Sequence, residues 1–142
     1  MSSGGRLALD ANILLRAVFG VRVLHLVKRY EDHVVFCVPD ICFDEARKHV
    51  LPIALRRGMN PARSLGILDD LERTLEVVDR SLYEDHRAEA RARIERRDLN
   101  DWPILATTLL LDCPLWTEDR DFFGTGVATW TTDNIELYLR AR

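Results

Sequence analysis

Four acidic residues stand where strands or helices are expected to begin or end, and together they could bind metal. Asp10 ends an apolar run, and Glu45 lies about one turn into the helix that follows the next apolar run. Asp101 begins an apolar helix, and Asp119 follows a short strand-like segment. Carboxylates that share a pocket raise each other's pKa, and hard divalent cations such as Mg²⁺ or Mn²⁺ relieve the repulsion. A site of this kind can activate water and stabilise the leaving oxygen of a phosphodiester.

Three residues near these acids have more than one interpretation. Asn12 could cap the helix that follows the first strand, or it could orient Asp10, and the residues leave both roles open. Taken alone, Glu45 is more typical of a solvated helix residue than of a metal ligand. His49 lies four residues further along the same helix face and could touch Glu45, but a surface or packing role is favoured.

Short apolar segments alternate with helical patterns along the chain, and this alternation must position the acids. Apolar, partly β-branched runs predict strands at 6–10, 34–39, 75–79, 114–117 and 127–131. Helical spacing of apolar residues predicts helices at 11–17, 23–30, 41–57, 61–73, 82–97, about 101–111 and 134–140. This order is typical of an α/β fold, a three-layer sandwich around a central parallel sheet of about four to five strands. The carboxyl ends of parallel strands share one edge, so acids far apart in sequence can converge there.

Polar residues indicate where several helices begin. Asp98 or Asn100 can cap the helix that carries Asp101, where a helix N-terminus tolerates negative charge. Ser81 is predicted to cap the long helix that follows it, and Asp133 is predicted to cap the last helix.

Length, charge and cysteine content limit the class of protein. A length of 142 residues fits one domain, taken as 6–142, with residues 1–5 as a flexible leader or a remnant of expression. No apolar run approaches the ~20 residues of a membrane span, and the N-terminus lacks the features of a signal peptide. The three cysteines are interpreted as buried reduced thiols of a cytoplasmic protein. A net charge of −3 argues against a dedicated DNA-binding module, but not against a nuclease whose acids hold cations.

Four segments, taken in order along the chain, resemble the PIN-domain family of nucleases. They are 9–12, 39–45, 97–106 and 117–122, and the likeness covers about residues 6 to 132. The resemblance places the acidic quartet of the family on Asp10, Glu45, Asp101 and Asp119. It also implies further acids at Asp121 and Asp98, and a site threonine at Thr117.

The resemblance implies metal-dependent endonucleolytic cleavage of RNA, with Mg²⁺ or Mn²⁺ as cofactor. One or two cations would be held by Asp10, Asp101 and Asp119, with Asp121 as a further ligand. Glu45 would ligate a cation or orient the attacking water. A bare domain of this length is similar to VapC-like toxins of toxin–antitoxin pairs, which are usually dimers neutralised by a small partner protein. The implied partners are therefore RNA, a small antitoxin and a second copy of the chain, without a membrane.

Arginines on the predicted helices are candidates for contact with the RNA backbone. They are Arg16, Arg87, Arg91 and Arg97. A solvated face with ion pairs explains the arginine-rich helix at least as well, because Glu89 lies four residues before Arg93.

Other functions remain to be weighed against a toxin nuclease. A PIN nuclease of RNA maturation or decay would carry the same acids, and a catalytically quiet PIN-like module could bind RNA or a protein without cutting. The intact quartet argues against the quiet module, because an idle site has no physical reason to keep repelling charges together. A phosphotransfer receiver domain would need a Lys after the last strands, and no Lys follows Lys48.

Overall fold

The structure is a computed structural model, and it describes residues 5–95 and 98–142 of the chain. Its strands are β1 (Arg6–Leu9), β2 (Val35–Pro39), β3 (Glu76–Val78), β4 (Leu115–Trp116) and β5 (Thr129–Trp130). Its α-helices are α1 (Ala11–Phe19), α2 (Arg22–Tyr30), α3 (Asp40–Arg56), α4 (Pro61–Thr74), α5 (Arg80–Tyr83), α6 (Arg87–Ile94), α7 (Trp102–Leu111) and α8 (Ile135–Arg140). Its 3-10 segments are η1 (Glu84–His86), η2 (Leu99–Asp101) and η3 (Arg120–Phe122). The predicted leader at 1–5 lies outside the described residues, except for Gly5.

The strands form one parallel sheet in the order β3-β2-β1-β4-β5, which confirms the predicted α/β class. From β1 the chain first builds outward through β2 and β3, and it later returns to place β4 on the opposite side of β1. The order therefore reverses between β1 and β4. Open α/β sheets bind their ligands at the carboxyl ends of the strands that flank such a reversal.

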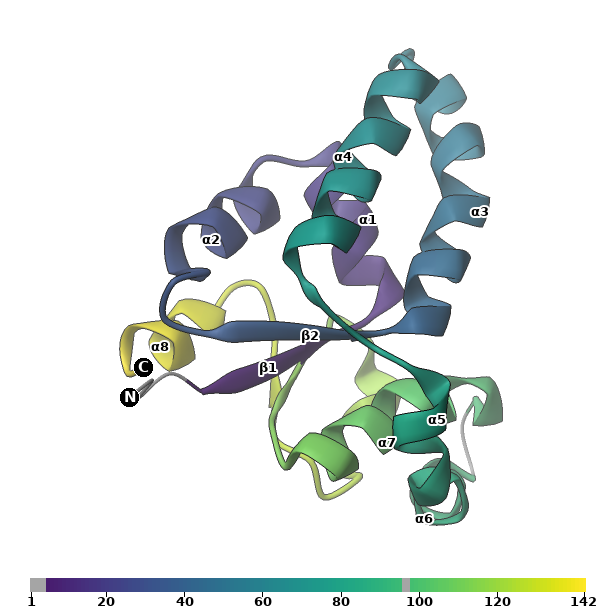
Figure 1. Ribbon diagram of the computed structural model, residues 1–142, viewed down its shortest axis with the longest axis vertical. Coiled ribbons are helices and arrows are strands. Elements are labelled where there is room, and N and C mark those ends of the chain that lie inside the picture. The colour runs from purple at the N-terminus through teal and green to yellow at the C-terminus, as the bar shows by residue number, and fades with distance from the viewer. Residues whose placement is uncertain (1–4, 96–97) are drawn as a thin grey trace.

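Helices cover both faces of the sheet, which gives the predicted three layers. Figure 1 shows α1, α2, α3 and α4 on one side of the sheet and α5, α6 and α7 on the other. Alternate residues of each strand face the two layers, as the pleat requires. In β1, Leu7 and Leu9 pack in the core beneath α1 to α4, whereas Ala8 packs in the core that contains α7.

The helix α7 is the most apolar helix near the sheet, and it carries Asp101 at its start. Its first seven residues are all buried, including Ile104 and Leu105. A helix that is hydrophobic on all sides is stable only inside a protein, and α7 contacts both β1 and β2. No helix in the described part of the chain is both long enough and apolar enough to cross a membrane.

The prediction of one continuous helix at 82–97 is wrong. The structure has α5, then the 3-10 segment η1, then α6, and residues 96 and 97 lie outside the described part. Two contacts hold α5 against the start of α3: the amide of Arg80 and the hydroxyl of Tyr83 donate to the carboxylate of Asp40, at 3.0 and 2.8 Å. The cap is Asp79 rather than Ser81, because the Asp79 carboxylate accepts from the Ser81 amide at 2.9 Å.

Helix starts elsewhere correct two predictions. Asp133 does not cap α8, because it forms an ion pair with Arg22 at 2.9 Å and the helix begins after Asn134. Neither of the two candidates before α7 caps that helix directly: Asp98 caps the preceding segment η2, where its carboxylate accepts from the Asn100 amide at 2.9 Å.

Candidate metal centre

A pocket of about 620 Å³ opens where the strand order reverses, beside the carboxyl ends of β1 and β4. Its apolar wall comes from residues such as Leu15, Ile104 and Phe122. Its carboxylates are Asp10, Glu45, Asp98, Asp101 and Asp119. The four acids of the predicted quartet therefore line one pocket, although more than a hundred residues separate the first from the last.

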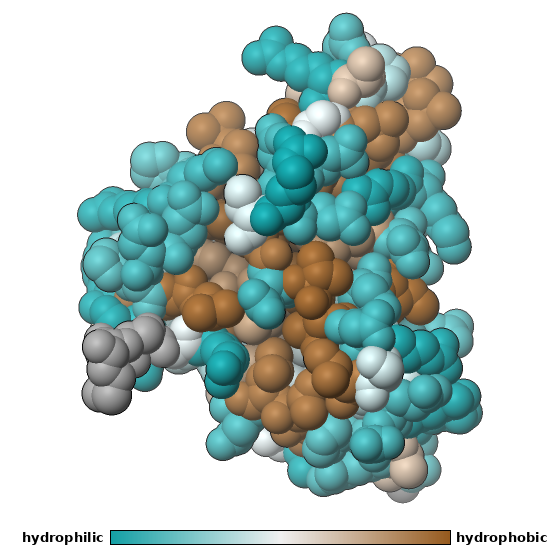
Figure 2. All heavy atoms as spheres, in the orientation of Figure 1, coloured by the Kyte–Doolittle hydropathy of each residue, from teal (hydrophilic) through white to brown (hydrophobic). Residues whose placement is uncertain are grey.

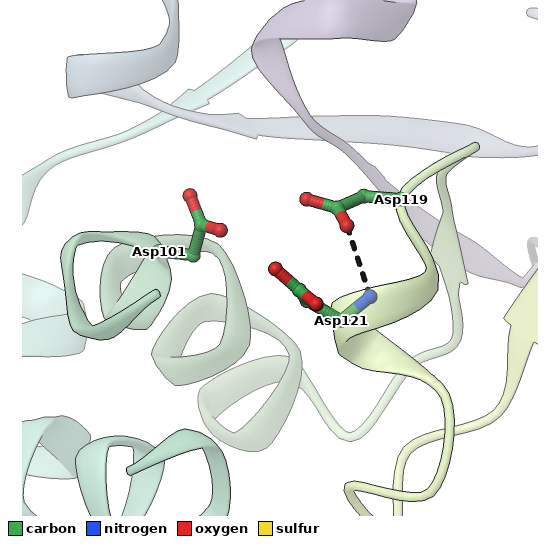
Figure 3. Close-up of side chains that lie close together, drawn as sticks. All are labelled: Asp101, Asp119 and Asp121. Carbon is green, nitrogen blue, oxygen red and sulfur yellow. Dashed lines mark hydrogen bonds between the residues drawn. The ribbon is translucent and has the colours of Figure 1, made fainter. Parts of the chain in front are cut away.

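Within this region, three carboxylates form a tight group. Asp101, Asp119 and Asp121 each offer an oxygen atom, and these atoms lie within 4.8 Å of one another. Figure 3 shows the three side chains turned toward a common space from the start of α7 and from η3. Asp10 and Glu45 line the pocket but do not belong to a group of three this close among the described residues.

The 3-10 segments η2 and η3 position this group. The carboxylate of Asp119 caps η3 by accepting from the amide of Asp121 at 2.9 Å, which fixes the two acids relative to each other. Asp101 ends η2 and immediately precedes α7, but its side chain makes no capping hydrogen bond with the helix. Its carboxylate is therefore available to a ligand in the pocket.

Thr117 connects Asp10 to Asp119 across the two central strands. Its buried hydroxyl donates to the Asp10 carboxylate at 2.5 Å and accepts from the Asp119 amide at 3.0 Å. The second oxygen of Asp10 accepts from the Ile13 amide at 3.0 Å, so Asp10 also caps α1. Both oxygens of Asp10 are thus fixed by hydrogen bonds. Thr117 has the supporting position expected from the sequence.

Burial dominates the electrostatics of Asp10. The side chain is only 8% exposed, and this burial raises the pKa of Asp10 to about 6. The hydrogen bonds from Thr117 and Ile13 lower the pKa, while the charges of Asp119 and Glu118 raise it further.

Asp101 shows the effect of its acidic neighbours. Burial is the first cause that raises the pKa of Asp101 to about 7, and the charges of Asp98, Asp119, Asp10 and Asp121 add to it. Near neutral pH Asp101 is therefore partly protonated, and a bound cation would displace that proton. An all-oxygen set of closely placed carboxylates suits a hard divalent cation such as Mg²⁺ or Mn²⁺.

Glu45 stands on the rim of the pocket, on α3. Its side chain is half exposed, and one oxygen lies 3.7 Å from Nε2 of His49. The contact between His49 and Glu45 that the sequence allowed is therefore present, and His49 is also exposed at the surface, as the favoured interpretation expected. Both residues line the pocket. Cys42 lies three residues before Glu45 on the same helix face, and its place in the pocket was missed. Its thiol is buried, which raises its pKa, and the charge of Asp10 raises the pKa further.

Asn12 lies in the first turn of α1, where its side chain borders the same pocket. The capping role considered for it is wrong, because Asp10 caps the helix. The role of orienting Asp10 is not seen either. Within the described residues, the side-chain hydrogen bonds of Asp10 go to Ile13 and Thr117.

The four arginines considered for RNA contact lie in different places. Arg16 lines a second pocket next to the acidic one. The guanidinium of Arg87 lies 5.2 Å from the ring centroid of Trp102, which directly follows Asp101. Arg91 is exposed on α6, and Arg97 lies outside the described residues. The expected pair between Glu89 and Arg93 is present at 2.8 Å.

The chain belongs to the PIN-domain family, because the family model described as "PIN domain" matches residues 8–140. Among solved structures, VapBC2 from Rickettsia felis bound to a promoter DNA fragment is 16% identical, with a TM-score of 0.70 over 89% of this chain and 98% of that one. PAE2754 from Pyrobaculum aerophilum is 13% identical, with a TM-score of 0.73 over 100% of this chain and 99% of that one. A toxin–antitoxin complex from Klebsiella pneumoniae is 19% identical, with a TM-score of 0.63 over 89% and 97%. At these identities the likeness shows the fold alone. No curated protein matches the chain.

Proposed function

We propose that this PIN-domain protein is a divalent-metal-dependent endoribonuclease that hydrolyses RNA phosphodiester bonds. The observation that carries the proposal is the group formed by Asp101, Asp119 and Asp121, whose oxygens lie within 4.8 Å of one another. The raised pKa of Asp101, to about 7, supports it, because burial and then the neighbouring carboxylates disfavour an ionised Asp101 that has no counter-ion.

In this proposal each acid has a distinct task. Asp101, Asp119 and Asp121 hold the cation, and Asp10 completes the set directly or through water. The chemistry supplied by bound Mg²⁺ or Mn²⁺ is positive charge, which eases deprotonation of water and stabilises the leaving 3′ oxygen. Glu45, on the open rim, joins the ligands or orients the attacking water. Thr117 holds the Asp10 carboxylate and the Asp119 backbone in fixed positions relative to each other through its two hydrogen bonds.

We further propose that the nuclease is the toxin of a toxin–antitoxin pair. Two proteins of similar fold are described as VapBC2 and as part of a toxin–antitoxin complex, which supports a small protein partner. Figure 2 shows apolar side chains gathered near the outer end of the α3–α4 hairpin, where Leu51, Leu55 and Met59 are exposed. Such a surface suits a protein contact, either with an antitoxin or with a second copy of the chain.

We place the protein in the cytoplasm, where its substrate would be found. Cys37, Cys42 and Cys113 are buried and free, as expected, and reduced thiols suit a reducing compartment.

The test is cleavage of a mixed RNA pool with Mg²⁺ or Mn²⁺, run beside an EDTA control. Asp101→Asn should abolish cleavage, because it removes a ligand charge at nearly constant volume. Asp44→Asn is the matched control, since Asp44 is exposed on α3 next to Glu45 but does not line the pocket. Cleavage by Asp101→Asn at the wild-type rate would overturn the site.

The same proteins also separate the nuclease from a quiet binding module. If wild type binds Mn²⁺ by calorimetry, loses that binding in Asp101→Asn, and still cuts no RNA in the pool, a narrow substrate or a co-purified inhibitor is indicated. If wild type neither binds a divalent cation nor cuts RNA, the metal centre is wrong and the quiet binding module is favoured.

A further inference from the structure

A second pocket, of about 660 Å³, adjoins the acidic pocket. Both pockets are lined by Asn12 and Leu15 of α1 and by Ile53 of α3, so the two hollows share a wall. The volume is within the range of sites that hold a small molecule, and it exceeds what a lone phosphate would fill. A chain that crosses the acidic pocket toward α1 would enter this space next.

The charge of the second pocket is opposite to that of the first. Three arginines line it, Arg16, Arg22 and Arg57. Arg22 is neutralised by Asp133 at 2.9 Å, whereas neither Arg16 nor Arg57 has a carboxylate partner among the described residues. The remaining acid in the lining, Glu118, accepts from the Thr132 amide at 2.6 Å. The lining of the second pocket therefore has three guanidinium groups and two carboxylates, a net charge of +1, beside a pocket lined by five carboxylates.

An aromatic ring supports one of these arginines. The guanidinium carbon of Arg57 lies 5.6 Å from the ring centroid of Phe19, and both residues line the pocket. Phe19 is half buried and packs against the core beneath α1 to α4, so the ring is anchored. Aromatic rings and arginine planes are the surfaces on which proteins stack unpaired RNA bases.

We propose that the second pocket binds the nucleotide next to the scissile bond of a single-stranded RNA, with Arg16 and Arg57 at its phosphate and the Phe19–Arg57 pair under its base. The proposal rests on the proposed nuclease function and names the substrate class of that site. Arginine recognises phosphate through paired donors, and its exposed plane stacks on a base. Stacking requires an unpaired base, which selects single strands over duplex.

The test measures RNA binding without cleavage. The probe is a 5′-labelled single-stranded RNA of about ten nucleotides. Its binding to the protein in EDTA is measured by fluorescence anisotropy. Arg57→Ala should weaken binding about tenfold, because it removes a phosphate contact and a stacking surface. Each of Arg16→Ala and Arg57→Ala should lower the slope of log affinity against log salt by about 0.7.

Arg56→Ala is the matched control, because Arg56 is the last residue of α3, immediately precedes Arg57, is exposed, and lines neither pocket. It removes the same net charge from the same region. Equal losses in Arg56→Ala and Arg57→Ala would overturn the proposal, since they would reflect only the overall field. Arg57→Lys separates the two contacts: it should keep the salt slope of wild type but not its affinity.

A duplex and inorganic tripolyphosphate serve as competitors. Single-stranded RNA should displace the labelled probe at least tenfold better than either, in line with the contribution of base stacking. Equal competition by tripolyphosphate would show a general anion site and overturn the proposal. Because these measurements need no catalysis, they are independent of the nuclease test. If wild type cleaves RNA with metal but Arg16→Ala and Arg57→Ala bind RNA as wild type does, this inference alone is refuted. If both variants lose binding but wild type cleaves no RNA, the second pocket remains a single-stranded RNA site, and its place next to a scissile bond is refuted together with the nuclease.

Discussion

Replacing Asp10 by Asn is expected to stabilise the metal-free protein above neutral pH, although Asp10 belongs to the proposed metal site. Burial raises the pKa of Asp10 from 3.8 to about 6, so ionisation of this carboxyl disfavours the folded state. A rise of about two units corresponds to about 3 kcal/mol in the free energy of unfolding. Asn is close to Asp in volume and carries no charge, so Asp10→Asn avoids that cost.

Changed hydrogen bonds reduce this gain. The Asn oxygen can still accept from the Ile13 amide, which now donates to Asp10 at 3.0 Å. The Thr117 hydroxyl, however, loses its charged acceptor, and this costs about 1 kcal/mol. The expected net stabilisation by Asp10→Asn is therefore about 2 kcal/mol once Asp10 is fully ionised in wild type.

The raised pKa fixes the direction of the pH dependence. In wild type, the stability linked to Asp10 is fully present below its unfolded pKa of 3.8, and it is lost as the pH rises through about 6. The variant lacks this titration. The difference in free energy of unfolding between Asp10→Asn and wild type should therefore shrink from about 2 kcal/mol near pH 8 to about zero near pH 4.5.

Urea unfolding in EDTA at these two pH values measures the difference, with Asp44→Asn as an exposed control that should match wild type at both. Adding Mg²⁺ at about a hundred times its Kd should stabilise wild type by about 2.7 kcal/mol, and Asp10→Asn, which lacks a ligand charge, by less than about 0.7 kcal/mol. The order of stability should therefore reverse when the metal is added. A variant less stable than wild type in EDTA near pH 8, or an advantage independent of pH, would refute the reasoning.

Two further variants test how the site is held and used. Thr117→Val should weaken Mn²⁺ binding about ten- to a hundredfold in a calorimetric titration, because the hydroxyl joins Asp10 to Asp119, whereas Thr117→Ser should bind nearly as wild type does. If Thr117→Val binds Mn²⁺ as tightly as wild type, Thr117 does not support the metal site. Glu45→Gln should lower kcat by a factor of about 100 or more if Glu45 assists the attacking water, and an unchanged kcat would leave it as a surface partner of His49.

The parallel sheet could be predicted because its strands are short, apolar and separated by helical patterns. Asp10 and Thr117 come directly after such strands, so their place at one edge of the sheet follows from the class of fold. The reversal of strand order between β1 and β4 could not be predicted from local patterns, because it depends on pairing between residues far apart in the chain.

The errors arose where long-range contacts override local preference. The helix predicted at 82–97 is divided because Tyr83 bonds to Asp40, a residue 43 positions earlier. Asp133 has the residue type of a cap, but its partner is Arg22. Asp121 was expected among the metal ligands only from the family resemblance, because its placement beside Asp101 depends on the turn geometry of η3, which the local acidic pattern does not indicate.

The pairing of β1 with β4 has a consequence for synthesis of the chain. Asp10 emerges from the ribosome before its partner Thr117, which lies 107 residues later and is followed by Asp119 and Asp121. A nascent chain that ends before β4 has an open edge on β1 and only part of the acidic set. Domains generally fold as units during synthesis, so the two halves of the pocket can meet only after β4 has been synthesised. A partial product of translation should therefore have no metal centre, and premature termination before β4 should yield a chain without activity.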